Sequence, residues 1–104
     1  MNFDDDKQAI EFFQRSIEIS LALFGKLHPI VGTTYFGIGN AYSKLADHKQ
    51  ALNFFQKALA NLLHCFGEDH PSVMTTRFCI SQASLYDKQS QMNQVRPEKS
   101  LNIY

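Results

Sequence analysis

Apolar residues recur at spacings of three and four along two segments of the chain, residues 6–24 and 48–66. This spacing places them on one face of an α-helix, so each segment predicts an amphipathic helix. The first face consists of Ile10, Phe13, Ile17, Leu21 and Phe24, and the second of Leu52, Phe55, Leu59, Leu62 and Phe66. No stretch alternates apolar and polar residues with a period of two, so no strand is expected.

The same signals follow both of these segments. Each ends at a glycine, Gly25 or Gly67, which takes the positive φ of a helix end at low cost. Three residues later comes a His-Pro pair, and proline suits the first turn of a helix, where its missing N–H would have no partner. Helices should therefore begin again at the two prolines. The predicted helices are residues 6–24, 29–45, 48–66 and 71–88.

The turn at residues 46–48 is so short that the helices on either side of it should form an antiparallel hairpin. After the fourth helix, residues 89–104 are mostly polar and include Pro97, which predicts a tail or linker. The helical domain is therefore expected to cover residues 1–88.

The chain carries an internal repeat of 42 residues. Residues 5–45 and 47–87 are identical at 18 of 41 aligned positions, and Phe12 falls on Phe54. A repeat of this length is typical of solenoids, in which stacked units share one continuous core. The expected fold class is all-α, an α-solenoid of antiparallel helical hairpins with about two repeats and four helices.

The hairpin at residues 29–66 resembles a tetratricopeptide repeat. Its two helices read Tyr35-x2-Ile38-Gly39-x2-Tyr42 and Ala51-x3-Phe55-x2-Ala58, similar to the family pattern W-x2-L-G-x2-Y followed by A-x3-F. The small residues would let the helices approach, and the aromatic rings would fill the space around them. The predicted packing residues are Tyr35, Ile38, Gly39, Tyr42, Ala51, Phe55 and Ala58.

The 42-residue period, the longer second helix and its F-G-x-x-H-P ending look like the kinesin light chain type of tetratricopeptide repeat. Repeats of that type carry a pair of asparagines on the inner helix, facing the groove. The matching positions here hold Phe36-Gly37 and Phe78-Cys79, so those peptide-binding asparagines are not carried over. In the second copy, Arg77, Ser81 and Ser84 replace the packing residues Tyr35, Gly39 and Tyr42.

Composition excludes several classes of function. Ten Lys and Arg balance ten Asp and Glu, which argues against nucleic acid or an anionic membrane as a partner. No apolar run is long enough for a membrane span, the first residues are acidic, and there are two cysteines; together these suggest a cytoplasmic protein. No catalytic motif is present, so we expect no enzyme, no catalytic residue and no cofactor.

Two clusters are candidate sites of chemistry. His64, Cys65 and His70 lie near each other, but His70 repeats His28 in the turn and is expected to cap a helix, so no metal site is expected. Cys65 and Cys79 lie on successive helices, where buried cysteines usually act as small apolar residues.

A solenoid of this kind predicts a module that binds other proteins, with a short peptide or partner helix lying in a concave groove. The groove would be lined by the inner helices 29–45 and 71–88. Its candidate residues are Phe36, Asn40, Ser43, Lys44, Phe78 and Gln82. The alternative is a purely structural or self-associating segment of a longer array without a ligand of its own.

Both outer helices should expose apolar side chains, so the isolated chain is expected to form a homodimer or larger assembly. The residues expected to be exposed are Phe12, Ile17 and Leu21 on the first helix and Phe78, Ile80 and Leu85 on the fourth.

Overall fold

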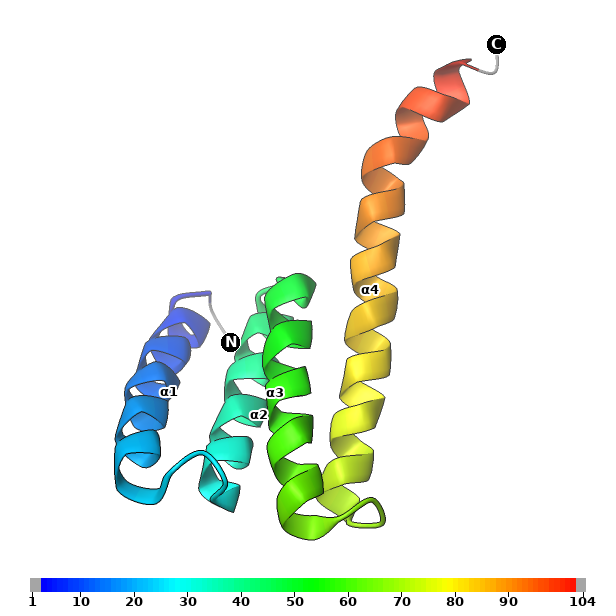
Figure 1. The fold of residues 1–104 in the computed structure, drawn as a ribbon. Helices are drawn as coiled ribbons and strands as arrows, with labels where there is room; N and C mark the ends of the chain where they lie inside the picture. Colours follow the sequence, from blue (N-terminus) through cyan, green and yellow to red (C-terminus); the bar gives the residue numbers. More distant parts are fainter. Residues whose placement is uncertain (1–2, 103–104) are drawn as a thin grey trace.

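The computed structural model describes the backbone of residues 3–102 and the side chains of residues 5–89. Within that backbone the chain forms helices and turns and no strand, as expected. The four helices are α1 (Phe3–Phe24), α2 (Pro29–Lys44), α3 (His48–Phe66) and α4 (Pro71–Asn102). Figure 1 shows α1, α2 and α3 side by side, with α4 continuing well past their ends. The all-α, four-helix prediction is confirmed.

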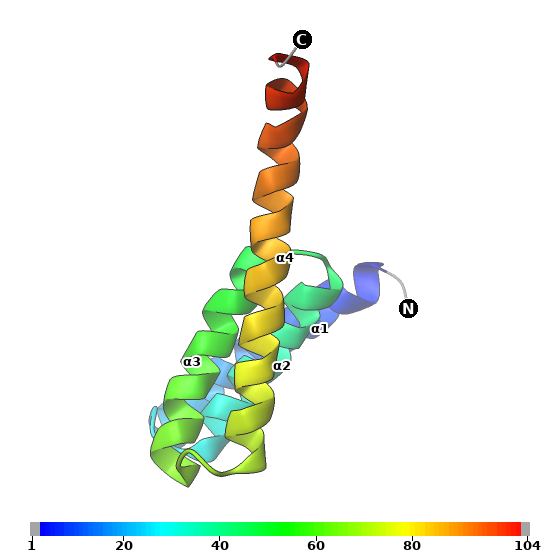
Figure 2. The same ribbon diagram turned by 90° about the vertical axis from the view of Figure 1, so that its right-hand side faces the viewer.

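Each helix packs mainly against the helix that follows it along the chain: α1 against α2, α2 against α3 and α3 against α4. The molecule is accordingly elongated, with extents of 60 × 33 × 22 Å. Figure 2, turned by 90°, shows α4 running the length of the hairpin and beyond it. Packing between sequence neighbours is the arrangement of a solenoid.

The fourth helix departs from prediction. It runs to Asn102, so the predicted helix end at residue 88 is wrong; residues 103–104 lie outside the described residues. That residues 89–104 form a tail or linker stays a prediction. No glycine or proline occurs between Pro71 and Pro97, and four glutamines, Lys88 and Leu85 lie in this segment, all residue types that favour helix. The end of the domain at residue 88 stays a prediction. The other predicted bounds agree to within three residues.

The F-G-x-x-H-P turns owe their shape to the histidines. Nδ1 of His28 accepts a hydrogen bond from the backbone N–H of Ile30 at 3.1 Å, and Nδ1 of His70 accepts one from Ser72 at the same distance. Each imidazole also lies against the phenylalanine that ends the preceding helix, with ring centroids 4.5 Å apart in the first turn and 4.2 Å in the second. The histidines therefore cap α2 and α4, which confirms their predicted local role.

The turn between α2 and α3 is closed by two backbone hydrogen bonds. The N–H of Ala46 donates to the carbonyl of Ser43, and the N–H of Asp47 donates to that of Tyr42, both at 3.0 Å. This pair of bonds is a Schellman motif, whose central residue must adopt a left-handed conformation. Ala46 has φ 62°, at a position that glycine usually occupies. The turn sends α3 back along α2.

Close approach of the helices depends on the glycines of α2. A Cβ at Gly39 would lie 2.7 Å from the ring of Phe55, and one at Gly37 would lie 2.8 Å from the ring of Phe13. Glycine costs helix stability, but here it leaves space for an aromatic ring from each neighbouring helix. Phe55 is consequently almost fully buried, at 2% exposure.

The outer helices expose most of the apolar residues expected there. Phe12, Leu21, Phe78 and Leu85 are exposed. Ile17 is the exception on α1: it is buried, because it lies on the side of α1 that packs against α2. On α4, Ile80 is half-buried because it packs against the core cluster that contains Ala51, Phe55 and Ala83. These two expectations of exposure were wrong.

Candidate binding groove

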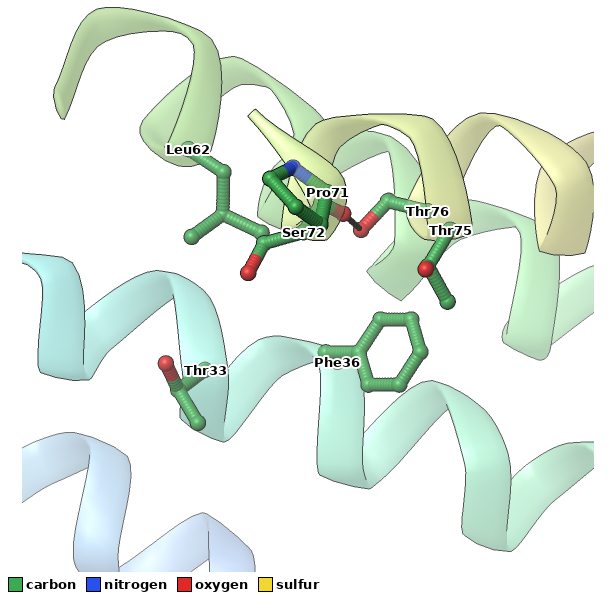
Figure 3. A pocket seen from close by; sticks show the side chains of 7 residues that line it. All are labelled: Thr33, Phe36, Leu62, Pro71, Ser72, Thr75 and Thr76. Atoms are coloured by element: carbon green, nitrogen blue, oxygen red, sulfur yellow. Dashed lines mark hydrogen bonds between the residues drawn. The ribbon is translucent and has the colours of Figure 1, made fainter. Parts of the chain in front are cut away.

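A pocket of about 240 Å³ lies between α2 and α4, with Leu62 of α3 and Phe36 of α2 at its floor. Figure 3 shows the side chains that line it: Thr33 and Phe36 come from α2, and the start of α4 lies opposite them. The lining residues are Thr33, Phe36, Leu62, Pro71, Ser72, Thr75 and Thr76. The pocket therefore lies where the two first helices of successive hairpins meet, which is the inner wall expected from the repeat.

The floor of this pocket is apolar and fixed. Phe36 is half-buried, with its ring centroid 5.4 Å from that of Phe55, so its ring is held by the core while one side faces the pocket. Leu62 is only 3% exposed and packs against Ala58 and Val73. A partner's apolar side chain would find a preformed surface here.

The rim of the pocket carries hydroxyl groups, and a repeated pair of threonines explains their placement. The second threonine of each pair is buried and donates to the carbonyl four residues earlier: Thr34 to Ile30 at 2.8 Å and Thr76 to Ser72 at 2.7 Å. The first threonine of each pair, Thr33 or Thr75, is exposed at the rim. The Oγ1 of Thr33 donates to the carbonyl of Pro29 at 3.2 Å.

The six groove residues named from sequence divide into two groups. Phe36 lines the pocket, whereas Asn40, Ser43, Lys44, Phe78 and Gln82 do not. Asn40 and Lys44 lie one and two helical turns beyond Phe36 along α2 and are exposed, while Ser43 is half-buried. On α4, Phe78 is 62% exposed and Gln82 is exposed one turn further on.

Sequence reasoning missed six of the seven lining residues. Five of these belong to α2 and to the start of α4, and they are Thr33, Pro71, Ser72, Thr75 and Thr76. For the threonines a signal was present in the sequence. The Thr-Thr pair recurs at the 42-residue spacing, and in each copy its first threonine lies three residues before a phenylalanine. Leu62 gave no such signal, since its place in the pocket depends on how α3 packs.

The residues predicted to hold the hairpin together occupy its interface. Ile38, Ala51 and Ala58 are fully buried, and Phe55 lies against Gly39. The ring of Tyr42 stacks on Phe54 at 5.7 Å between centroids, and the ring of Tyr35 lies 6.1 Å from the same residue. Phe54, between the two tyrosines, was not named from sequence as a packing residue.

Asn61 adds a polar contact that sequence did not indicate. Its amide Nδ2 donates to the carbonyls of Lys26 at 2.8 Å and His28 at 3.0 Å, and its side chain lies against Gly32. The residue is 6% exposed. It therefore fastens the turn before α2 onto α3, since buried backbone carbonyls need such partners.

Residues of the candidate chemical clusters make contacts within the fold. The Sγ of Cys65 donates to the carbonyl of Leu27 at 2.9 Å. Burial raises the pKa of the Cys79 thiol above its ordinary value, which disfavours the reactive thiolate. Among the side chains of residues 5–89, no group of three or more His, Cys, Asp or Glu is arranged to hold a metal ion. None of the described helices is both long and apolar enough to cross a lipid bilayer.

A larger but more open hollow of about 440 Å³ lies between α1 and the end of α2. Its walls include Lys7, Glu11 and Asp47, which carry both signs of charge. Its apolar lining consists of buried Ile10 and half-buried Tyr42 and Leu45.

Comparison with known proteins gives one match. The family model described as "Tetratricopeptide repeat" matches residues 3–64, more than half of the chain. The match covers α1, α2 and nearly all of α3. No curated protein and no solved structure is significantly similar to the chain.

Proposed function

Because the chain belongs to the tetratricopeptide repeat family, whose repeats generally mediate protein–protein interactions, we propose that it holds a short peptide or partner helix in the groove between α2 and α4. The observation that carries this proposal is the pocket of about 240 Å³ with Phe36 and Leu62 at its floor. An apolar side chain of the partner would fill the pocket, and the threonines at the rim would bond to the partner's backbone.

Along the groove, polar side chains would fix the partner's orientation. Asn40 on α2 and Gln82 on α4 each offer an amide that both donates and accepts hydrogen bonds. Lys44 is exposed beyond Asn40 and would contact an acidic group on the partner. Phe78 would add apolar contact on α4. Ser43 is half-buried and would contribute little direct contact.

The proposed module is not an enzyme, uses no cofactor and acts in the cytoplasm on protein partners rather than on nucleic acid or membranes. We also propose that its repeats are of the kinesin light chain type, on the basis of the 42-residue period and the F-G-x-x-H-P turn. Gly37 lies under the ring of Phe13 with no room for a side chain, so an asparagine of that type could not be accommodated there without movement.

The test is to select peptides from a random library on the folded chain and to measure their binding to variants. Thr33→Arg and Thr75→Arg would obstruct the rim of the pocket, and both residues are exposed, so the fold should be kept. The expected result is a loss of peptide binding of at least tenfold with unchanged melting. Gln56→Arg, on an exposed part of α3 outside the groove, is the matched control. Equal binding by all three variants would refute the groove.

A second candidate, a purely structural segment without a ligand, is supported by the apolar side chains exposed on α1 and α4. Alanine at Asn40, Lys44 and Gln82 separates the two. Weaker peptide binding with unchanged melting supports the groove, whereas a structural segment yields no selected peptide that depends on these residues.

A further inference from the structure

The 42-residue repeat makes α1 the counterpart of α3 and α2 the counterpart of α4. The face of α3 that packs against α2 includes Phe54, Phe55 and Asn61. Their counterparts on α1 are Phe12, Phe13 and Ile19. Phe12 is 67% exposed and Ile19 is 58% exposed, and Leu23, one turn beyond Ile19, is 70% exposed. α1 therefore exposes to solvent the face that, on its counterpart α3, packs against α2.

α4 presents the matching face. On α2, the face that receives α3 includes Gly32, Tyr35, Gly39 and Tyr42. The counterparts on α4 are Met74, Arg77, Ser81 and Ser84. Met74 is 61% exposed, and Leu85, on the same side of the helix, is 60% exposed. This face of α4 has no helix against it in the described part of the chain.

The chain does not cover this face of α4 in the way that it covers α2. After α2, the turn at residues 45–47 brings α3 back along it. The counterpart positions, residues 87–89, are helical, because α4 continues without a break to Asn102. The described residues therefore hold no hairpin partner for α4 at the register of the repeat.

We propose that a second copy of the chain supplies it, with α1 of one copy packed against α4 of the next. This head-to-tail contact would reproduce the packing of α3 against α2 that exists within each chain. The proposal does not depend on peptide binding in the groove. Both halves of the interface are present on one chain, so each copy would offer one face to each of two neighbours.

The residues that would meet are chemically compatible. The pair Asn61–Gly32 would be replaced by Ile19 and Met74, two apolar side chains whose burial favours association. Phe12 would take the place of Phe54 and meet Arg77, whose guanidinium can lie over an aromatic ring. Phe13 would meet Ser81 in place of Gly39, and because serine has a Cβ, α1 and α4 would lie further apart at this point than α3 and α2 do.

One pairing is unfavourable. Within the chain, the ammonium of Lys57 lies 5.7 Å from the ring centroid of Tyr35. The counterparts of these two residues are Arg15 and Arg77, so the assembly would bring two arginines close together. Glu68, 3.5 Å from Arg77, would partly offset the two positive charges. Added salt screens like charges, so association is expected to strengthen at higher ionic strength.

Assembly would also build a second pocket. The counterparts of the pocket residues Thr33 and Phe36 are Thr75 and Phe78 on α4, and those of Pro71 and Ser72 are Pro29 and Ile30. In a head-to-tail pair, Phe78 of one copy would face Ile30 of the next across a continued groove. Phe78 and Ile30 are 62% and 42% exposed in the single chain.

Two blocked variants of the full chain test the proposal by sedimentation velocity. One carries Ile19→Lys and Leu23→Lys on α1, and the other Met74→Lys and Leu85→Lys on α4; all four residues are exposed, and circular dichroism checks that both variants stay helical. The unmodified chain is expected to form a concentration-dependent series of multiples of 11.9 kDa. Each variant alone should be a monomer, and an equal mixture should form a 1:1 dimer, because one intact junction remains.

Leu27→Asp is the control, because Leu27 is exposed in a turn and its counterpart in the second copy is Asp69. It should associate as the unmodified chain does. The proposal is overturned if the unmodified chain stays monomeric up to millimolar concentration, if one blocked variant still dimerises alone, if the mixture forms no dimer, or if Leu27→Asp abolishes association.

Discussion

α2 and α4 are counterparts in the repeat, and they agree on one side and differ on the other. On the side facing the preceding helix, Val31 and Val73 are both buried, at 1% and 0% exposure, and so are Thr34 and Thr76. On the opposite side, α2 is enclosed by α3, whereas α4 is open. On the side with the same neighbour in both copies the valine and the threonine are kept, although Cys79 replaces Gly37, and the side whose neighbour differs has changed.

The turn explains this difference. Ala46 allows the chain to reverse after α2. Because α3 then packs closely against α2, α2 needs a glycine where the ring of Phe55 approaches it and aromatic residues around that point. The counterpart of Ala46 is Lys88, which is helical. No helix of the same chain returns along α4 within the described residues, and α4 carries polar residues in place of Gly39 and the two tyrosines. The following predictions probe this contrast.

The largest effect is expected from the phenylalanine between two helices. Phe55→Ala should lower the free energy of unfolding by about 3–5 kcal/mol, and its half-buried counterpart Phe13→Ala by about half as much. Phe55 touches both α2 and the core residues of α4, whereas Phe13 has one helix to contact. Urea denaturation at low protein concentration measures both changes. Equal losses would mean that α4 does not enclose Phe55.

Glycine and serine at equivalent positions should respond with opposite signs. Gly39→Ala would place a Cβ 2.7 Å from the ring of Phe55 and should cost about 1–3 kcal/mol of stability, although alanine is the better helix former. Ser81→Ala, on exposed α4, should stabilise by a few tenths of a kcal/mol. Thermal denaturation followed by circular dichroism measures both. A stabilising Gly39→Ala would contradict the close packing of α2 and α3.

Glycine at the turn and at its helical counterpart should also act in opposite directions. Ala46→Gly should stabilise by about 0.5–1 kcal/mol, because it relieves the left-handed strain at φ 62°. Lys88→Gly should destabilise by up to about 1 kcal/mol, because glycine disfavours a helix interior. The two melting temperatures give the result. If Lys88→Gly were stabilising, α4 would end where α2 ends.

The smallest effect concerns Cys79, which occupies the position of Gly37. Burial raises the pKa of this thiol above its ordinary value of 9.0, so less thiolate forms at a given pH. The folded state then holds its proton more tightly than the unfolded state, and this contribution to stability is lost as pH rises above 9.0.

The measurement is the alkylation rate of the Cys65→Ser variant between pH 7 and 10, folded and in urea. Serine at 65 can still donate to the carbonyl of Leu27. The folded protein should react more slowly, with its midpoint at higher pH. Identical profiles would place Cys79 in solvent.

Much of this could be derived from residues close together in sequence. The Gly and His-Pro signals set the starts of α2 and α4, and the spacing of Ala51, Phe55 and Ala58 marked the buried face of α3, because helix caps and helical periodicity act over a few residues. The pocket was harder to predict. Only Phe36 was found among its lining residues, because the others meet across three helices whose crossing depends on glycines and ring positions.

The sequence by itself determined that this chain is a tandem repeat of amphipathic helices, where each helix begins and which side of it is apolar. Only the tertiary structure decided that Ile17 is buried and that Asn61 fastens the turn before α2 onto α3. The reason is physical: periodicity fixes the direction of a side chain relative to its own helix, whereas burial depends on whether another helix comes to cover it.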